Sequence, residues 1–383
     1  MVVDLGTSYR RLLVALCLIC GTGLGSAQRL RVSSKRQALW TAQLSTAGPA
    51  TKAAQIPNLH HDDAVGVSFL DDDLLIVHQL EGTGRLSSRA DIDASSSYRL
   101  HVSFFEVASG KVSFTRDWAT RAHGSSIQAT KGGMVVRTGP EIKFYTKSLT
   151  ELQHIALPEG GASIISVSPT GKTVMINQYD GKESYFEIRD GDGFQIRTSW
   201  SETPPLRHLY SISDAAIVAA DPDQKQVIAS DFSSGRWRIL KGNFKPGCVY
   251  WPIFVGEKVA ASEICGKLVL FSTAGQTIME SRPEKHESEG EKIEAARDGT
   301  IVAVSLTRRK GGGVFDTNVR RVSDQIIVYD LSSTSRVLTL DLAPVPKIEY
   351  HFALSPDGSK LAVVTDNQVS VYSVPKQPAE NDN

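Results

Sequence analysis

The feature that most constrains the fold is a strand–turn–strand unit that recurs along the chain. Residues 353–364 read Ala-Leu-Ser-Pro-Asp-Gly-Ser-Lys-Leu-Ala-Val-Val, and residues 166–176 are a near copy with Thr170 in place of the aspartate. A tight turn between two apolar runs predicts a β-hairpin. Successive turns in the middle of the chain are about 42 residues apart, which is the period of four-stranded propeller blades. Weaker copies of the unit turn at Asp71-Asp72, Gly132-Gly133, Asp214, Gly256-Glu257 and Asp298-Gly299.

A second hairpin follows each of these units. An aromatic-bearing strand, a small polar turn and another strand occupy 105–112, 232–239, 271–278 and 329–337. Two hairpins per repeat give four strands, named A to D from the axis outwards, and the turns indicate seven repeats.

The last repeat lacks its fourth strand, and Gln37–Leu44 offers one at the other end of the chain. Pairing these two ends would close the ring and remove its open edges. The sequence therefore predicts an all-β fold, a single seven-bladed β-propeller of four-stranded blades. An N-terminal strand is expected to complete the last blade.

The Ser-Pro-Asp-Gly turn at 355–358 resembles the repeats of WD-repeat-like β-propellers of exported bacterial proteins, and 168–171 is a variant of it. As architecture the resemblance covers about the whole mature chain, although the strong motif occurs once. The Gly-His and Trp-Asp hallmarks of the eukaryotic repeats are absent. The resemblance implies a binding scaffold and carries over no catalytic residue.

The first 27 residues have the three parts of a secretory signal. Arg10 and Arg11 precede the apolar run Leu12–Ile19, and small residues before Gln28 offer a cleavage site. The run is short for a membrane span of about 20 residues, so a membrane anchor is the less favoured alternative. We expect a secreted or periplasmic protein with no membrane span in its mature chain. The expected divisions are a signal peptide at 1–27, a propeller at 28–375 and a polar C-terminal tail at 376–383.

The charge balance and the motifs of the chain argue against several classes of function. Lys and Arg number 42 and Asp and Glu number 42, so the chain has no net basic field and is not expected to bind nucleic acid. It contains no Gly-x-Ser-x-Gly elbow, His-Glu-x-x-His pair, phosphate loop or Rossmann fingerprint. A noncatalytic protein is therefore favoured over an enzyme, and no cofactor is expected.

Two cysteines remain once the signal is removed. With a two-residue turn at 256–257, Val255 opposes Lys258 and Cys248 opposes Cys265. The cysteines then occupy a non-hydrogen-bonded pair, where Cα atoms lie close enough for a disulfide. Export makes oxidation plausible, so we expect this disulfide, and the alternative is two buried thiols.

Two B–C connections are long, at 81–97 in the first repeat and 307–324 in the sixth. Antiparallel topology places both on the face that also carries the D–A connections, on either side of repeat seven. A mobile basic loop with an apolar residue would suit an acidic protein, a glycan or an anionic surface. The alternative is tolerated growth of surface loops. The candidate partner-binding residues are Arg308, Arg309, Lys310, Phe315, Arg320, Arg321, Arg85 and Arg89.

Metal and sugar sites are weaker candidates. An Asp-Gly-Asp-Gly run at 190–193 could suggest calcium, but it lacks the full calcium loop and suits a tight turn, as does 71–73. The five tryptophans fall mostly in or beside outer strands, where aromatic residues pack between blades; a sugar-binding stripe is the alternative. A metal site above the channel would use four histidines that precede A strands, although ordinary loop histidines are favoured: His60, His61, His123 and His208.

Taken together, the sequence predicts an exported, noncatalytic and monomeric β-propeller that binds a protein or glycan partner through its B–C and D–A face. One alternative is a propeller enzyme or a metal- or cofactor-binding protein with a site at the channel mouth. Another is an obligate structural component of an envelope complex.

Overall fold

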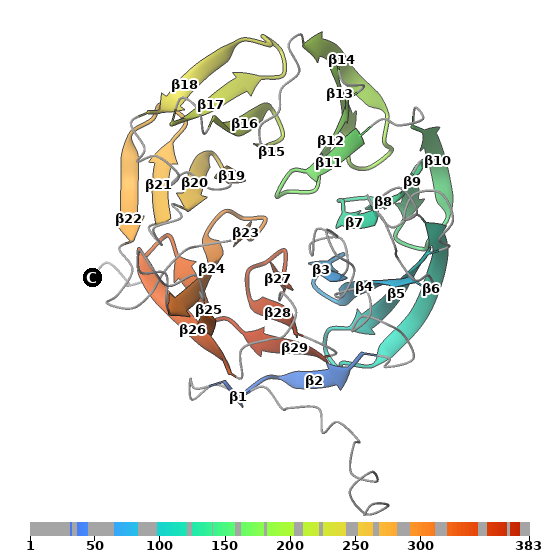
Figure 1. Ribbon diagram of the computed structural model, residues 1–383, viewed down its shortest axis with the longest axis vertical. Helices are drawn as coiled ribbons and strands as arrows, with labels where there is room; N and C mark the ends of the chain where they lie inside the picture. Colours follow the sequence, from blue (N-terminus) through green and yellow to red (C-terminus); the bar gives the residue numbers. More distant parts are fainter. Residues whose placement is uncertain are drawn as a thin grey trace, which may run out of the picture.

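Seven antiparallel sheets surround a central axis in the computed structural model (Figure 1). Six of these sheets have four strands and one has five, which confirms the predicted all-β, seven-bladed propeller. The structure describes residues 31–32, 37–44, 65–82, 98–120, 125–139, 141–157, 162–179, 182–202, 210–221, 225–242, 252–262, 268–281, 292–310, 320–343, 351–365 and 368–375. The expected signal peptide (1–27) and C-terminal tail (376–383) lie outside this set. Within it, no helix is long and apolar enough to cross a membrane.

The blades follow one another along the chain, each running from the axis outwards. Blade 1 is β3 (Val65–Phe69), β4 (Leu74–Gly82), β5 (Tyr98–Glu106) and β6 (Val112–Thr120). Blade 2 is β7 (Ser125–Ala129), β8 (Gly133–Thr138), β9 (Glu141–Thr146) and β10 (Glu151–Ala156). Blade 3 is β11 (Ala162–Val167), β12 (Thr173–Tyr179), β13 (Ser184–Asp190) and β14 (Ile196–Glu202). Blade 4 is β15 (Tyr210–Ile212), β16 (Ala216–Asp221), β17 (Gln226–Asp231) and β18 (Trp237–Lys241).

The last three blades include the two strands from the N-terminal end. Blade 5 is β19 (Pro252–Val255), β20 (Lys258–Ser262), β21 (Leu268–Ser272) and β22 (Thr277–Ser281). Blade 6 is β23 (Ile293–Ala295), β24 (Ile301–Lys310), β25 (Arg320–Asp330), β26 (Ser335–Ala343) and β1 (Arg31–Val32). Blade 7 is β27 (His351–Leu354), β28 (Lys360–Thr365), β29 (Gln368–Ser373) and β2 (Trp40–Gln43).

The ring closes as the sequence predicts. Strand β2 pairs antiparallel with β29, with Trp40 opposite Val371. The indole Nε1 of Trp40 donates a hydrogen bond to the carbonyl oxygen of Val107 in blade 1 at 2.6 Å, so the closing strand also joins the neighbouring blade. Strand β1 adds a fifth strand to blade 6, which the sequence analysis did not foresee because Arg31-Val32 is too short to carry a strand pattern. The N-terminal segment thus covers the outer edges of blades 6 and 7.

The hydrophobic core lies between the blades. Second strands are buried on both faces, as in β12, where Thr173 to Asn177 are all buried. Outer strands alternate instead, as in β14, because only one of their faces meets a neighbouring blade. Blade 7 packs against blade 1 on one side and blade 6 on the other, so blades 1 and 6 flank it as predicted.

The Ser-Pro-Asp-Gly turn is a self-contained hydrogen-bonded unit. Ser355 Oγ accepts the Lys360 N–H at 2.9 Å and donates to the Asp357 carboxylate at 2.6 Å. The carboxylate also accepts the Ser359 N–H, and Gly358 has a φ of +69° that favours glycine. Partial burial raises the pKa of Asp357, but the hydrogen bonds from Ser355 and Ser359 outweigh it and lower that pKa to about 2.

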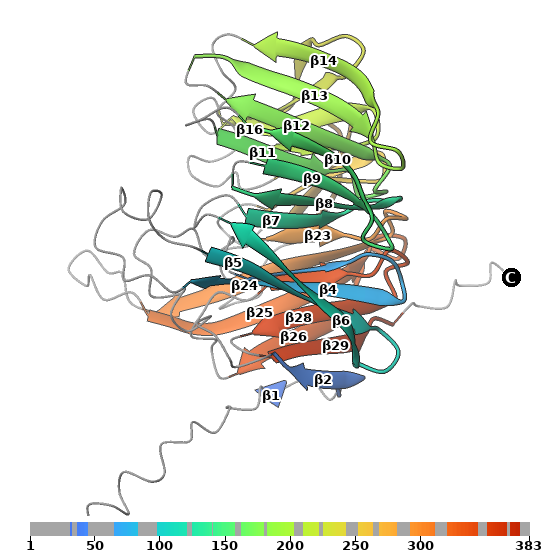
Figure 2. The same ribbon diagram turned by 90° about the vertical axis from the view of Figure 1, so that its right-hand side faces the viewer.

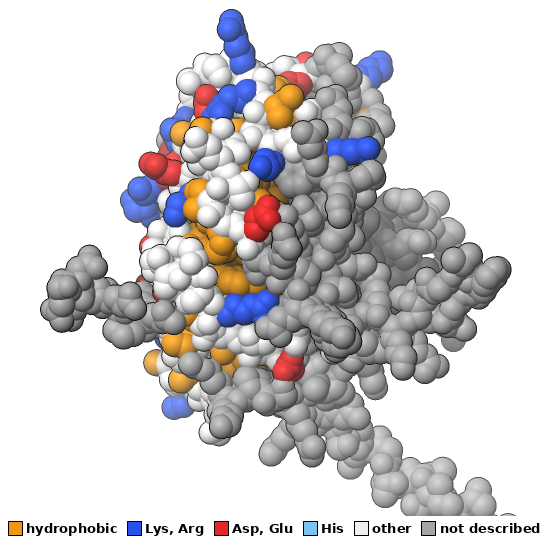
Figure 3. Space-filling view, turned by 90° about the vertical axis from the view of Figure 1, so that its left-hand side faces the viewer, with side chains coloured by type: hydrophobic (Ala, Val, Ile, Leu, Met, Phe, Trp, Pro, Cys, Tyr) orange, Lys and Arg blue, Asp and Glu red, His pale blue; other side chains and the backbone are white. Residues whose placement is uncertain are grey.

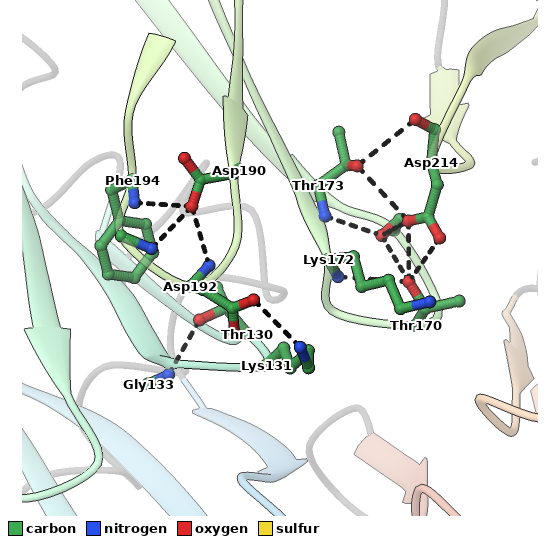
Figure 4. Close-up of polar contacts among 12 residues, drawn as sticks. Thr130, Lys131, Gly133, Thr170, Lys172, Thr173, Asp190, Asp192, Phe194 and Asp214 are labelled. Atoms are coloured by element: carbon green, nitrogen blue, oxygen red, sulfur yellow. Dashed lines mark hydrogen bonds and ion pairs between the residues drawn. The ribbon is translucent and has the colours of Figure 1, made fainter. Parts of the chain in front are cut away.

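The variant turn, with Thr170 in place of the aspartate, obtains its carboxylate from the next blade. Asp214 accepts hydrogen bonds from Ser168 Oγ and Thr170 Oγ1, both at 2.7 Å. Figure 4 shows Asp214 with Thr170 and Thr173. Thr173 Oγ1 contacts the same oxygen of Asp214 at 3.4 Å. The substitution that weakens the motif in the sequence therefore becomes a link between blades 3 and 4.

Similar links recur on this end of the propeller, which holds the A–B and C–D turns and is called the turn face. The Lys131 N–H donates to Gly171 O at 2.8 Å, which joins blades 2 and 3. The Asp357 N–H donates to Asp72 Oδ1 at 3.1 Å, which joins blades 7 and 1. Neighbouring blades are therefore bonded turn to turn here.

Candidate functional site: the hairpin face

The opposite end of the propeller carries the B–C hairpins and is called the hairpin face. Figure 2 shows β24 and β25 of blade 6 reaching beyond the strands of blade 7 on this side. Pairing between them continues to Lys310 opposite Arg320, with an irregularity between Arg308 and Arg309. The expected mobile loop at 307–324 is therefore wrong for half of its length, because residues 307–310 and 320–324 belong to β24 and β25, and the remaining 311–319 lie outside the described residues. Strand-forming residues such as Val322 are compatible with this pairing, which a charge-based interpretation overlooked.

The register places like charges opposite each other at the end of this hairpin. Arg309 is the cross-strand partner of Arg321, and Lys310 is the cross-strand partner of Arg320. In the register of β24 and β25, two successive rungs therefore hold only basic residues.

A further cation reaches the same end from the N-terminal segment. Arg31 in β1 lies opposite Ala343 in β26, one position beyond the pair that joins Asp324 to Leu342. Arg31 is thus level with Ser323, three residues from the outer end of β25 at Arg320. Sequence reasoning missed this residue because the two-residue pairing of β1 has no pattern of its own.

The long hairpin of blade 1 is balanced by contrast. Glu81 is the cross-strand partner of Arg99. Arg99 also donates to Asp117 Oδ2 at 3.2 Å, and His101 Nδ1 lies 2.6 Å from Asp117 Oδ1. Strand pairing extends to Gly82 and Tyr98, so this connection too is shorter than the predicted 81–97. The candidates Arg85 and Arg89, like Phe315, lie outside the described residues and stay predictions.

Blade 1 also places three side chains in the order of a Ser-His-Asp relay: Ser103, His101 and Asp117. Ser103 Oγ lies 3.4 Å from His101 Nε2. Ser103 is paired on both sides, with Val77 in β4 and Thr115 in β6, so its backbone belongs to the ladder and is not arranged around an oxyanion. We interpret the array as part of the ion-pair network of blade 1.

The inner strands beneath the hairpin face hold an ion pair. Lys292 Nζ lies 3.1 Å from Glu294 Oε1 and donates to Phe352 O at 3.1 Å. Burial, together with the charge on Lys292, lowers the pKa of His78 to about 4, so His78 is neutral at neutral pH. His78 packs against Gly66, where an added Cβ would lie 2.1 Å from the imidazole Cε1.

Metal binding gains no support from the part of the chain that the structure describes, where no three His, Cys, Asp or Glu residues gather into a site. The four histidines of the predicted channel-mouth site, His60, His61, His123 and His208, lie outside it. Asp190 accepts the N–H groups of Gly193 and Gln195 at 2.6 and 2.9 Å. It also accepts those of Asp192 and Phe194 (Figure 4). These bonds lower its pKa despite some burial, and they fit the interpretation of this run as a tight turn.

Aromatic residues of the outer strands join blades. Trp118 Nε1 donates to Tyr145 Oη of blade 2 at 2.9 Å, and Trp237 Nε1 donates to Glu202 of blade 3 at 2.8 Å. Figure 3 shows hydrophobic side chains between the outer strands on one side of the ring. Ile239 and Ile278 are 64% and 48% exposed, and they lie on different blades, as single surface apolar residues commonly do.

The register around the predicted disulfide is as expected. Val255 pairs with Lys258 and Pro252 with Ala261, which is the pairing that follows from a two-residue turn at 256–257. Cys248 and Cys265 themselves lie outside the described residues, so the disulfide stays a prediction.

Comparison with known proteins shows the fold. No family model matches the chain, and no curated protein matches it in sequence. Among solved structures, Hsv2 of Kluyveromyces lactis matches with a TM-score of 0.51 and 13% identity, covering 83% of this chain and 96% of that one. A chain of the mitotic checkpoint complex matches with a TM-score of 0.51 and 13% identity, covering 89% and 96%. The C-terminal WD40 domain of Sif2 is similar at a TM-score of 0.48 and 12% identity, covering 89% and 99%. At 13% identity, the two matches with TM-scores of 0.51 show the propeller fold alone.

Proposed function

We propose that this chain is an exported, noncatalytic interaction scaffold that binds a protein partner through its hairpin face. The difference between the two ends of the propeller carries the proposal. The turn face uses its polar groups to bond blade to blade, whereas blade 6 on the hairpin face extends paired strands well beyond its neighbours. A chain of similar fold belongs to a protein assembly, the mitotic checkpoint complex, which supports the same assignment.

Export is part of the proposal. It is supported by residues 1–27, in which a positively charged start, an apolar run and a group of small residues follow one another as in a secretory signal. The mature protein would then act in the periplasm or outside the cell. A glycan partner is the alternative, since an arginine-rich hairpin also suits anionic sugars. Treating one sample of the captured material with protease and another with glycosidase distinguishes a protein partner from a glycan partner.

The test is a crosslinked capture with mature protein 28–383 and a matched variant in which 311–319 is replaced by Asn-Gly. This replacement leaves β24 and β25 intact and supplies a two-residue turn between Lys310 and Arg320. We expect the intact chain to capture a partner that the variant loses, with unchanged thermal unfolding. Equal capture by both forms would contradict the assignment of the binding face. A second control, Lys111→Glu with Arg236→Glu on the turn face, should capture normally.

A further inference from the structure

We propose that the outer edge of blade 4 binds an extended segment of a partner protein, which adds to the blade as a fifth strand and alternates acidic with apolar residues. The edge is β18 (Trp237–Lys241), the outermost strand of its sheet (Figure 1). The residues that would meet the segment are Arg238, Ile239 and Lys241. This inference goes beyond the proposed function, because it concerns the outer wall of the propeller and not its hairpin face.

The ring already contains a blade with five strands. In blade 6, β1 pairs antiparallel with the outer strand β26, with Arg31 opposite Ala343 and Val32 opposite Leu342. The outer edge of a blade in this propeller can therefore accept a further strand. In blade 4, no strand of the described residues pairs with the outer edge of β18. Such an edge presents backbone N–H and C=O groups that can pair with a strand of another chain.

The charge of β18 distinguishes it from the other outermost strands. Among those that the structure describes, it is the one that carries two basic residues and no acidic residue. Arg238 Nη1 donates to the carbonyl oxygen of Thr273 in blade 5 at 2.7 Å, and Lys241 Nζ donates to Thr277 Oγ1 at 2.8 Å. Both acceptors are uncharged, and neither cation pairs with a carboxylate of the described residues. These contacts hold two cations at the edge of the blade without neutralising them.

The side chains of β18 divide between the two sides of the blade. Arg238 and Lys241 both contact blade 5, and they share this side although they are three residues apart, because the pairing with β17 shifts between Ile239 and Lys241. Trp237 lies on the other side, where its indole Nε1 donates to Glu202 of blade 3. Ile239 comes directly after Arg238 and so shares the side of Trp237, and it is 64% exposed. One side of the edge is thus basic and the other is apolar.

This division specifies the chemistry of the partner segment. Successive side chains of a strand point to opposite faces of its sheet. A strand paired with β18 therefore places every second side chain beside Arg238 and Lys241, and the intervening side chains beside Ile239. Acidic residues in the first set would pair with the two cations, and apolar residues in the second set would cover the exposed isoleucine. A nucleic acid or a glycan could meet the cations but cannot form the backbone ladder of a strand.

The test measures binding of a synthetic peptide to mature protein 28–383. The peptide carries fluorescein and alternates glutamate with valine over about nine residues, a usual strand length. One control peptide has glutamine in place of glutamate. A second control is N-methylated at every backbone amide, so it keeps the side chains and the charge but donates no ladder hydrogen bond. Fluorescence anisotropy at about 50 mM salt, where exposed charges are weakly screened, gives Kd.

Two protein variants alter the edge itself. Arg238→Glu with Lys241→Glu reverses the charge of β18. Its matched control is Lys111→Glu with Lys172→Glu, which changes net charge equally at two exposed residues on the turn face of blades 1 and 3. Arg238→Gln with Lys241→Gln removes the charge but keeps side chains that donate hydrogen bonds, so it carries the test if the reversed variant does not fold. Thermal unfolding of each variant establishes that it folds.

We expect the charge-reversed variant to bind the glutamate peptide about tenfold or more weakly, and the turn-face control to change Kd less than about twofold. Hydrogen exchange of residues 237–241 should slow when the peptide binds, because the outward N–H groups of β18 become bonded. Replacement of 311–319 by Asn-Gly should leave peptide binding unchanged, which separates this inference from the proposed function.

Four outcomes would overturn the proposal. They are the absence of binding by the parent protein, equal Kd for the glutamate and glutamine peptides, equal Kd for parent and charge-reversed protein, and exchange that slows elsewhere but not at 237–241. Undiminished binding of the N-methylated peptide would also overturn it, because the cations would then attract acidic chains without strand pairing.

Discussion

The two ends of this propeller use polar residues in opposite ways. On the turn face, carboxylates and hydroxyls are satisfied within the fold, and several of these bonds cross from one blade to the next. On the hairpin face, blade 6 instead extends β24 and β25 as a paired hairpin beyond blade 7. Groups that bond each other stabilise the ring, whereas we expect a projecting hairpin to be available to a partner. Stability and binding are thus expected to separate between the two faces, and each prediction below tests that separation.

The largest expected effect concerns the predicted disulfide, which would lie on the hairpin face. If it forms, the hairpin face also stabilises the fold strongly, and the contrast between the two faces is smaller. If Cys248 and Cys265 form a disulfide, Cys248→Ser with Cys265→Ser should lower the free energy of unfolding by about 3 kcal/mol, as for loops of about this length. Urea unfolding of oxidised protein measures this loss, and mass spectrometry of non-reduced peptides detects the bond itself. Free thiols in protein isolated from an oxidising compartment would disprove the pairing.

A smaller loss is expected when the link between blades 3 and 4 is cut. Asp214→Ala removes the acceptor used by Ser168, Thr170 and Thr173, and should cost about 2 kcal/mol because hydrogen bonds to a charged group are lost. The matched control is Asp298→Ala, whose carboxylate bonds, among the described residues, to Thr300 in its own turn, and it should cost under about 1 kcal/mol. Both are read by urea unfolding. Equal losses in the free energy of unfolding would show that hydrogen bonds between blades stabilise the fold no more than hydrogen bonds within one turn.

The Ser-Pro-Asp-Gly turn gives the turn face an acid sensitivity. Because the pKa of Asp357 is about 2 in the folded protein and 3.8 ordinarily, its stabilisation is complete above pH 3.8 and is lost as the pH falls towards 2. Asp357→Asn should therefore cost about 1 kcal/mol at pH 7 and little at pH 2. Thermal unfolding of both proteins across this pH range measures the difference. If the loss of stability caused by Asp357→Asn does not change with pH, the negative charge of Asp357 does not stabilise the turn.

The sequence was informative where a residue pattern dictates a local geometry. The repeating hairpins gave the blade count, and the two-residue turn at 256–257 fixed the register that pairs Pro252 with Ala261. The aromatic pattern of the outer strands likewise predicted contacts between blades, as at Trp40 and Trp118.

The sequence was less informative where the geometry depends on segments far apart in the chain. Asp214 supplies a carboxylate to a turn 44 positions earlier, which no local motif indicates. Arg31 joins blade 6 only through the pairing of β1 with Ala343 and Leu342 of β26. The blade 6 insertion was interpreted as a loop because glycine and charge dominated its composition, whereas cross-strand pairing sets its actual extent.

The smallest expected effect is on stability and is the sharpest test of the contrast. In the register of β24 and β25, Arg309→Glu with Lys310→Glu would place an acidic residue opposite Arg321 and another opposite Arg320, so the free energy of unfolding should stay the same or rise by about 0.5 kcal/mol. The reciprocal change in blade 1, Glu81→Arg, places a cation opposite Arg99 and should lower it by a similar amount. Both are measured by urea unfolding at low salt, where exposed charges interact most. If the first variant loses stability instead, the cations of blade 6 are already neutralised within the fold, and the hairpin face would be satisfied internally just as the turn face is.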